Sequence, residues 1–81
     1  MLDDVALEAL RSREFIEKAS DRQHETWAIR NAASTWVDKE LLAPYEGLTE
    51  EQKENDRIIS VTAIKVYLKC VFDVDFHAPP A

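Results

Sequence analysis

The residues best suited to chemistry lie around a histidine near the middle of the chain. His24 begins a His-Glu-x-x-His pattern of the kind that binds zinc in metalloproteases, but Ala28 stands where that motif needs its second imidazole. The other histidine and the single cysteine, His77 and Cys70, are too scattered to complete a zinc site. A phosphate-binding loop is excluded because Gly47 is the only glycine. The sequence therefore predicts no metal, no cofactor and no enzyme.

The same region has residues suited to binding a flat ligand. His24, Trp27 and Asn31 follow one another at intervals of three and four residues, which places them on one face of a helix. Trp36 can fold back onto this face if the helix ends near Ser34. Two indoles would then stack on a ring while the imidazole and amide bond to its edge. Alternatively, both tryptophans anchor the core and His24 is a hydrogen-bonded residue at its margin; the two interpretations are compatible.

Helices must position these side chains, because one Gly and three Pro provide few of the turns that a small sheet needs. Apolar residues recur at helical spacing from Leu2 to about Ala19, and a second helical stretch continues to about Ala33. Between them, Ser20 and Asp21 either interrupt and cap the second helix or lie within one long helix. Periodicity leaves both alternatives open.

The second half of the chain is expected to form a loop and then a long helix. Pro44 disfavours helix just before it, so residues 34–48 are predicted to be a loop whose large apolar side chains pack across the core. Thr49 and Gln52 form a capping box, and the helix that follows should run to about Val71. Its acidic residues are expected to form a solvated face.

Taken together, the 81 residues predict one all-α domain over residues 1–76, with three to four helices and a long central loop. Alternating apolar residues in 72–76 indicate an extended segment that packs on the body, followed by a frayed tail over residues 77–81. Cys70 is expected to be a small buried residue. With no partner cysteine for a disulfide, the chain fits a reducing cytoplasm.

Charge and hydropathy narrow the possible partners. The formal net charge is −6 and Lys and Arg form no run, which argues against binding nucleic acid. No apolar stretch comes close to the length of about 18 residues that a membrane-spanning helix needs. The remaining partners are a small molecule, another protein or a second copy of the chain.

Several short motifs occur in a particular order along the chain. They are His-Glu-Thr-Trp at 24–27, Trp36, Leu-Ala-Pro-Tyr-Glu-Gly-Leu at 42–48 and Lys-Glu-Asn-Asp-Arg at 53–57. Over residues 14–70, this order and spacing resembles the RyR domain family, the repeat named after ryanodine receptors. The family occurs in large calcium-release channels and in small bacterial and viral proteins.

This resemblance implies a non-enzymatic helical module that binds a nucleotide-like ligand through its tryptophans. The chain departs from the family at Thr35, where the family has Gly, and in residues 37–43, which replace a longer basic hairpin. The expected pocket is therefore more open than in other members, or missing. The alternative is an acidic protein–protein interaction module, an adaptor or inhibitor, which includes a homodimer. The candidate ligand-binding residues are His24, Trp27, Asn31, Trp36, Tyr45 and Arg57.

Overall fold

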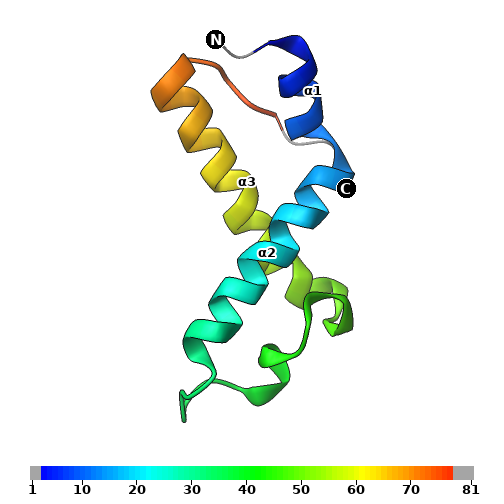
Figure 1. Cartoon of the computed structure of the whole chain (residues 1–81), viewed down its shortest axis with the longest axis vertical. Coiled ribbons are helices and arrows are strands. Elements are labelled where there is room, and N and C mark those ends of the chain that lie inside the picture. The colour runs from blue at the N-terminus through cyan, green and yellow to red at the C-terminus, as the bar shows by residue number, and fades with distance from the viewer. Residues whose placement is uncertain (1–2, 78–81) are drawn as a thin grey trace.

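The computed structural model describes residues 3–77, which contain three α-helices and two short 3-10 helices (Figure 1). In chain order these are α1 (Asp4–Arg11), α2 (Arg13–Asn31), η1 (Lys39–Leu42), η2 (Tyr45–Gly47) and α3 (Glu50–Phe72). The described range contains no strand, which confirms the all-α class. Within residues 3–77, none of the helices combines the length and apolar character that spanning a bilayer requires. The predicted helical start at Leu2 and most of the predicted tail, 78–81, lie outside the described residues.

The first helical break lies at Ser12, so the prediction of a helix reaching Ala19 is wrong. The Ser12 hydroxyl accepts a hydrogen bond from the backbone N–H of Phe15, as N-cap of α2, and donates to a carbonyl in the last turn of α1. Ser20 is buried inside α2, and its hydroxyl donates to the carbonyl four residues earlier at 2.7 Å. Of the two alternatives for Ser20 and Asp21, an interruption or cap is therefore wrong, and a position inside one continuous helix is confirmed.

Both ends of α3 are closed by local hydrogen bonds. The Thr49 hydroxyl accepts from the N–H of Gln52, and the Gln52 side chain accepts from the N–H of Thr49, which confirms the capping box. Asp73, in the left-handed conformation (φ 53°), ends the helix through backbone bonds to its last turn. Residues 73–77 then run back across the molecule and bury Phe76, as predicted, although Phe72 belongs to the helix.

The helices α2 and α3 cross near their midpoints (Figure 1), and each has a small buried serine in its middle part, Ser20 in α2 and Ser60 in α3. Small side chains allow helix backbones to approach closely. Above the crossing in this view, the returning segment 73–77 lies between α3 and the α1–α2 end of the molecule; below it, the η1–η2 connection lies beside α2. Within the described residues, the buried apolar side chains are Ile16, Tyr45, Leu48, Leu68 and Phe76.

The connection between α2 and α3 packs on the body as predicted, but it contains the two 3-10 helices instead of plain loop. Tyr45 and Leu48 are buried, while Leu41 and Leu42 are half-buried. Cys70 is exposed, because it lies on a face of α3 that α2 does not cover. The prediction that Cys70 is buried is therefore wrong.

Candidate functional site

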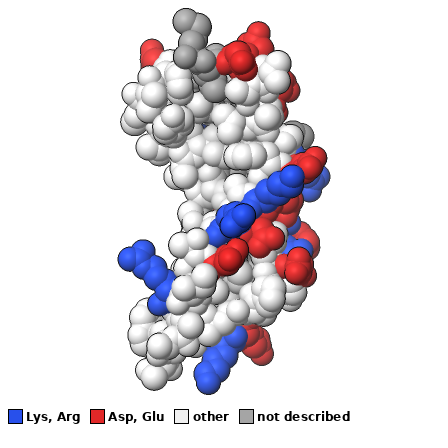
Figure 2. Space-filling view, viewed as in Figure 1, with Lys and Arg blue, Asp and Glu red and all other residues white. Residues whose placement is uncertain are grey.

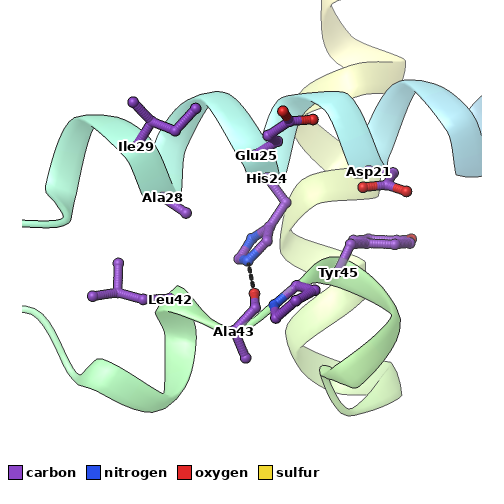
Figure 3. Close-up of a pocket in the computed structure, with 9 residues that line it drawn as sticks. Asp21, His24, Glu25, Ala28, Ile29, Leu42, Ala43 and Tyr45 are labelled. Atoms are coloured by element: carbon purple, nitrogen blue, oxygen red, sulfur yellow. Dashed lines mark hydrogen bonds between the residues drawn. The ribbon is translucent and has the colours of Figure 1, made fainter.

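His24 connects the three parts of the lower half of the fold. It projects from α2 and is only 4% exposed. Its Nε2 lies 2.7 Å from the carbonyl oxygen of Ala43, and since a carbonyl can only accept, Nε2–H is the donor (Figure 3). Its Nδ1 lies 3.1 Å from Oδ2 of Asp56 on α3. One imidazole thus holds the loop and the third helix against the second.

Asp56 is the partner that the sequence interpretation missed. It was expected on the solvated acidic face of α3, but it is 7% exposed, so that expectation is wrong. Burial raises the pKa of Asp56, and the neighbouring imidazole of His24 opposes that rise. A signal was present, because Asp56 precedes Ser60, Ile64 and Leu68 at intervals of four, the spacing of one ridge of a helix.

The geometry around His24 leaves little scope for catalysis by this side chain. Both ring nitrogens already have partners within the chain, so neither is free to take a proton from a substrate in this arrangement. Within residues 3–77, no three side chains of His, Cys, Asp or Glu lie together in a group that could hold a metal ion. The contacts of His24 are those of a side chain that fixes tertiary structure.

A second polar cluster joins α2, η2 and α3 through a single carboxylate. Glu17 accepts a 2.7 Å hydrogen bond from the Tyr45 hydroxyl and a 2.6 Å hydrogen bond from Nε of Arg57. Nη1 of Arg57 also contacts Glu50 at 3.0 Å and Glu54 at 3.4 Å. Three carboxylates of the chain therefore surround the guanidinium of Arg57, which is one of the candidate ligand-binding residues. Nothing local indicated Glu17, whose partners lie 28 and 40 residues away in the sequence.

These contacts shift the pKa values of the cluster. Burial and the hydrogen bond to Glu17 raise the pKa of the Tyr45 phenol to about 12. Partial burial alone would raise the pKa of Glu17, but the hydrogen bonds from Arg57 and Tyr45 and the positive charges of Arg57 and Lys53 outweigh it, and the pKa lies below its ordinary value. The Glu17 hydrogen bond is also the main reason that the pKa of Arg57 is raised. At neutral pH the Tyr45 phenol therefore keeps its proton and donates it to an ion pair formed by Glu17 and Arg57.

Only some of the predicted aromatic pocket is assembled. Trp27 stacks on the His24 ring at 5.8 Å between centroids, and Tyr45 lies tilted against the same ring at 6.4 Å. Asn31 turns back along its own helix and donates to the carbonyl of Trp27. Trp36 is 84% exposed, so the prediction that it folds over this face is wrong. After α2 ends, residues 32–37 form turns and bends at the lower tip of the molecule (Figure 1), where they have little to pack against.

A small cavity of about 270 Å³ does lie beside His24, between α2 and the loop (Figure 3). Ala28, Leu42 and Ala43 contribute apolar surface, and the lining also includes Asp21 and Glu25, although the Glu25 carboxylate points away from the loop (Figure 3). Neither tryptophan lines the cavity, and no Lys or Arg does. Its charge disfavours a phosphate group.

Comparisons of the chain with models of protein families, with curated proteins and with solved structures found no match. The resemblance to RyR domains rests on its motifs alone.

Proposed function

We propose that this protein is a non-enzymatic protein-interaction module that presents one face of α3 to a protein partner. The observation that carries this proposal is the distribution of apolar side chains. Within residues 3–77, five apolar side chains are buried, while nine large ones are at least about a third exposed. Five of the exposed side chains lie on α3: Ile59 and Val66 share one face, Tyr67 borders it, and Ile58 and Val71 lie to either side of it. Exposed apolar surface of this extent is typical of a binding surface.

The size of the surface supports the same proposal. The accessible surface is 6126 Å², whereas a compact monomer of 9.3 kDa is expected to expose roughly 5,000 Å². The radius of gyration is 14.3 Å, and a compact chain of this length would have roughly 12 Å. The accessible surface in excess of a compact monomer is of the same order as the area that one partner contributes to a standard interface, about 800 Å².

The charge distribution points to the same part of the molecule. Figure 2 shows Lys, Arg, Asp and Glu gathered mainly across the middle of the molecule, with acidic residues also at its upper end and an uncharged area over the C-terminal half of α3. Protein interfaces are depleted of charged residues at their cores, so this uncharged area fits the proposal.

A photocrosslinking experiment tests the proposal in the cells that naturally produce the protein. We expect p-benzoylphenylalanine in place of Val66, which is 56% exposed, to yield covalent adducts with protein. The same residue in place of Ile58, which is 57% exposed on a different side of the helix, serves as the matched control. Equal yields from the two positions, or none from either, would overturn the assignment of this face.

A second candidate function is the binding of a small ligand beside His24. The observation that favours it is the presence of the cavity. About 270 Å³ is close to the lower limit of ligand pockets, and Asp21 and Glu25 favour a neutral or cationic flat compound over a nucleotide. Adenosine and AMP provide a matched pair of probes, read by Trp fluorescence and thermal stability. A response to adenosine that exceeds the response to AMP is expected, and no response to either nucleoside or nucleotide would remove this candidate.

A further inference from the structure

We infer that the partner of α3 is a second copy of this chain, an inference that rests on the proposed interaction function. The contact surface is the α3 stripe, which we define as Ile59, Ala63, Val66 and Cys70. These residues follow one another at intervals of four, three and four. That is the spacing by which two helices pack along a common seam in coiled coils.

All four residues of the α3 stripe are exposed, and all four are uncharged. Tyr67 is also exposed and borders the stripe on one side. Ala63 is small enough for two helix backbones to approach closely, while Ile59 and Val66 supply the larger apolar contacts. The stripe therefore has the composition of a helix–helix interface but lacks a second helix within the chain.

Self-complementarity favours a second copy over an unrelated protein. In a two-fold dimer each surface meets itself, so any charge near the axis would face a like charge. The α3 stripe contains no charge, even though the chain as a whole carries a net charge of −6. Apolar side chains, by contrast, can pack against identical side chains without electrostatic repulsion.

The stability of the fold supplies a second reason. A domain of about 60–80 residues has a marginal core, and oligomerisation is one of the common ways to supplement it. Here the buried apolar core among residues 3–77 is only five side chains, and the excess exposed area matches one subunit's share of a dimer interface. Pairing of the α3 stripes would bury part of that excess in both copies at once.

The helix dipoles favour an antiparallel pair. A parallel pair would place like dipole ends side by side, with Glu50 and Glu51 of the two copies adjacent at their N-terminal ends. An antiparallel pair centred on the stripe places Ile59 of one chain beside the partner's Cys70, and Ala63 beside the partner's Val66.

Sedimentation equilibrium of the full chain provides the first test. We expect a mass of twice 9.3 kDa at high concentration, and a thermal midpoint that rises with concentration. Val66→Glu should weaken self-association at least about 100-fold, because it buries two unpaired carboxylates. Ile58→Glu, with the same new side chain at an equally exposed site, should leave it unchanged.

Disulfide crosslinking tests the orientation. Ile59→Cys should form a covalent dimer through the native Cys70 of the partner chain, whereas Lys65→Cys, which faces away from the stripe, should not. A Cys70–Cys70 dimer in the unmodified chain would support the second copy and overturn the antiparallel orientation.

A concentration-independent monomer would overturn the inference whether or not Val66→Glu folds, because the unmodified chain alone decides it. If such a monomer still gave adducts between position 66 and a different protein, the proposed interaction function would stand and the second copy would be excluded. A monomer without adducts would overturn both.

Discussion

Replacing Asp56 with alanine removes the partner of a buried imidazole nitrogen. His24 and Asp56 are 4% and 7% exposed, so water cannot freely replace the lost 3.1 Å contact. Leaving a buried polar group unsatisfied costs about 1–3 kcal/mol, and breaking a buried charged pair costs up to about 5 kcal/mol. We expect Asp56→Ala to lower the free energy of unfolding by about 2–4 kcal/mol. For 81 residues the total is about 4–12 kcal/mol, so the loss is a large share of it.

Asparagine at the same position separates the hydrogen bond from the charge. Its amide can donate to Nδ1 of a neutral His24 while Nε2–H keeps its bond to Ala43. We therefore expect Asp56→Asn to cost about 1 kcal/mol or less, well below the cost of Asp56→Ala.

The double variant His24→Ala/Asp56→Ala, together with the two single variants, completes a double-mutant cycle. His24→Ala loses both contacts and should cost about 3–5 kcal/mol. Once His24 is absent, removing Asp56 should cost much less than in the unmodified chain, and the coupling free energy should be about 1–3 kcal/mol.

Urea unfolding followed by far-UV circular dichroism measures all four proteins. Trp fluorescence gives a second probe, because Trp27 stacks on His24. One fixed protein concentration is needed, since self-association changes apparent stability. If Asp56→Ala lies within about 0.5 kcal/mol of the unmodified chain, the buried pair does not hold the fold together. Equal and larger losses in Asp56→Ala and Asp56→Asn would contradict the expectation that an uncharged hydrogen bond is sufficient at this position.

Three further predictions concern the second polar cluster and the upper core. Because the pKa of Tyr45 is raised from 10.0 to about 12, its contribution to stability is complete below pH 10 and is lost as the pH rises towards 12. The gap in unfolding free energy between the unmodified chain and Tyr45→Phe should therefore shrink by up to about 3 kcal/mol in alkaline urea titrations. The pKa of Glu17 is lowered from 4.5, so the advantage over Glu17→Gln should persist above pH 4.5 and disappear as the pH falls below it; a constant gap would contradict the ion pair. Phe76→Ala should cost about 3–5 kcal/mol in the same assay, while the exposed Trp36→Ala should cost less than about 0.5 kcal/mol.

The motifs that resemble RyR domains meet one another in the fold. His24 bonds to the backbone just before Pro44 and to Asp56, and Tyr45 and Arg57 bond to the same carboxylate. Residues that are 19 to 40 positions apart in the sequence thus form two buried or half-buried polar networks. Their residue types and spacing have a structural explanation that requires no ligand.

Local signals in the sequence predicted much of the fold. The capping box at Thr49 and the long helix that follows it depend on side chains and backbone within a few residues of one another, and both were confirmed. The packing of residues 41–48 was predicted from their large apolar side chains, and it was confirmed as well. The face shared by His24 and Trp27 was also predictable, because helix geometry alone places residues three positions apart side by side.

Where a helix begins was less predictable, because several serines can cap. Ser12 and Ser20 carry the same hydroxyl, and either can bond to a nearby N–H or to a carbonyl one turn earlier. Burial of Ser20 at the crossing with α3 decides which role it takes, and that burial is a property of the packed helices.

The sequence by itself determined the helical character of the chain, the cap of its longest helix and the shared face of His24 and Trp27. Only the tertiary structure decided which faces are covered and which partners the polar residues meet. Asp56 is buried because α2 lies over its side of α3, Cys70 is exposed because nothing within residues 3–77 covers the other side, and Trp36 is exposed because its turn lies beyond the end of α2. Periodicity identifies the residues that share a face, but burial depends on the neighbour that a face meets, and distant parts of the chain supply that neighbour.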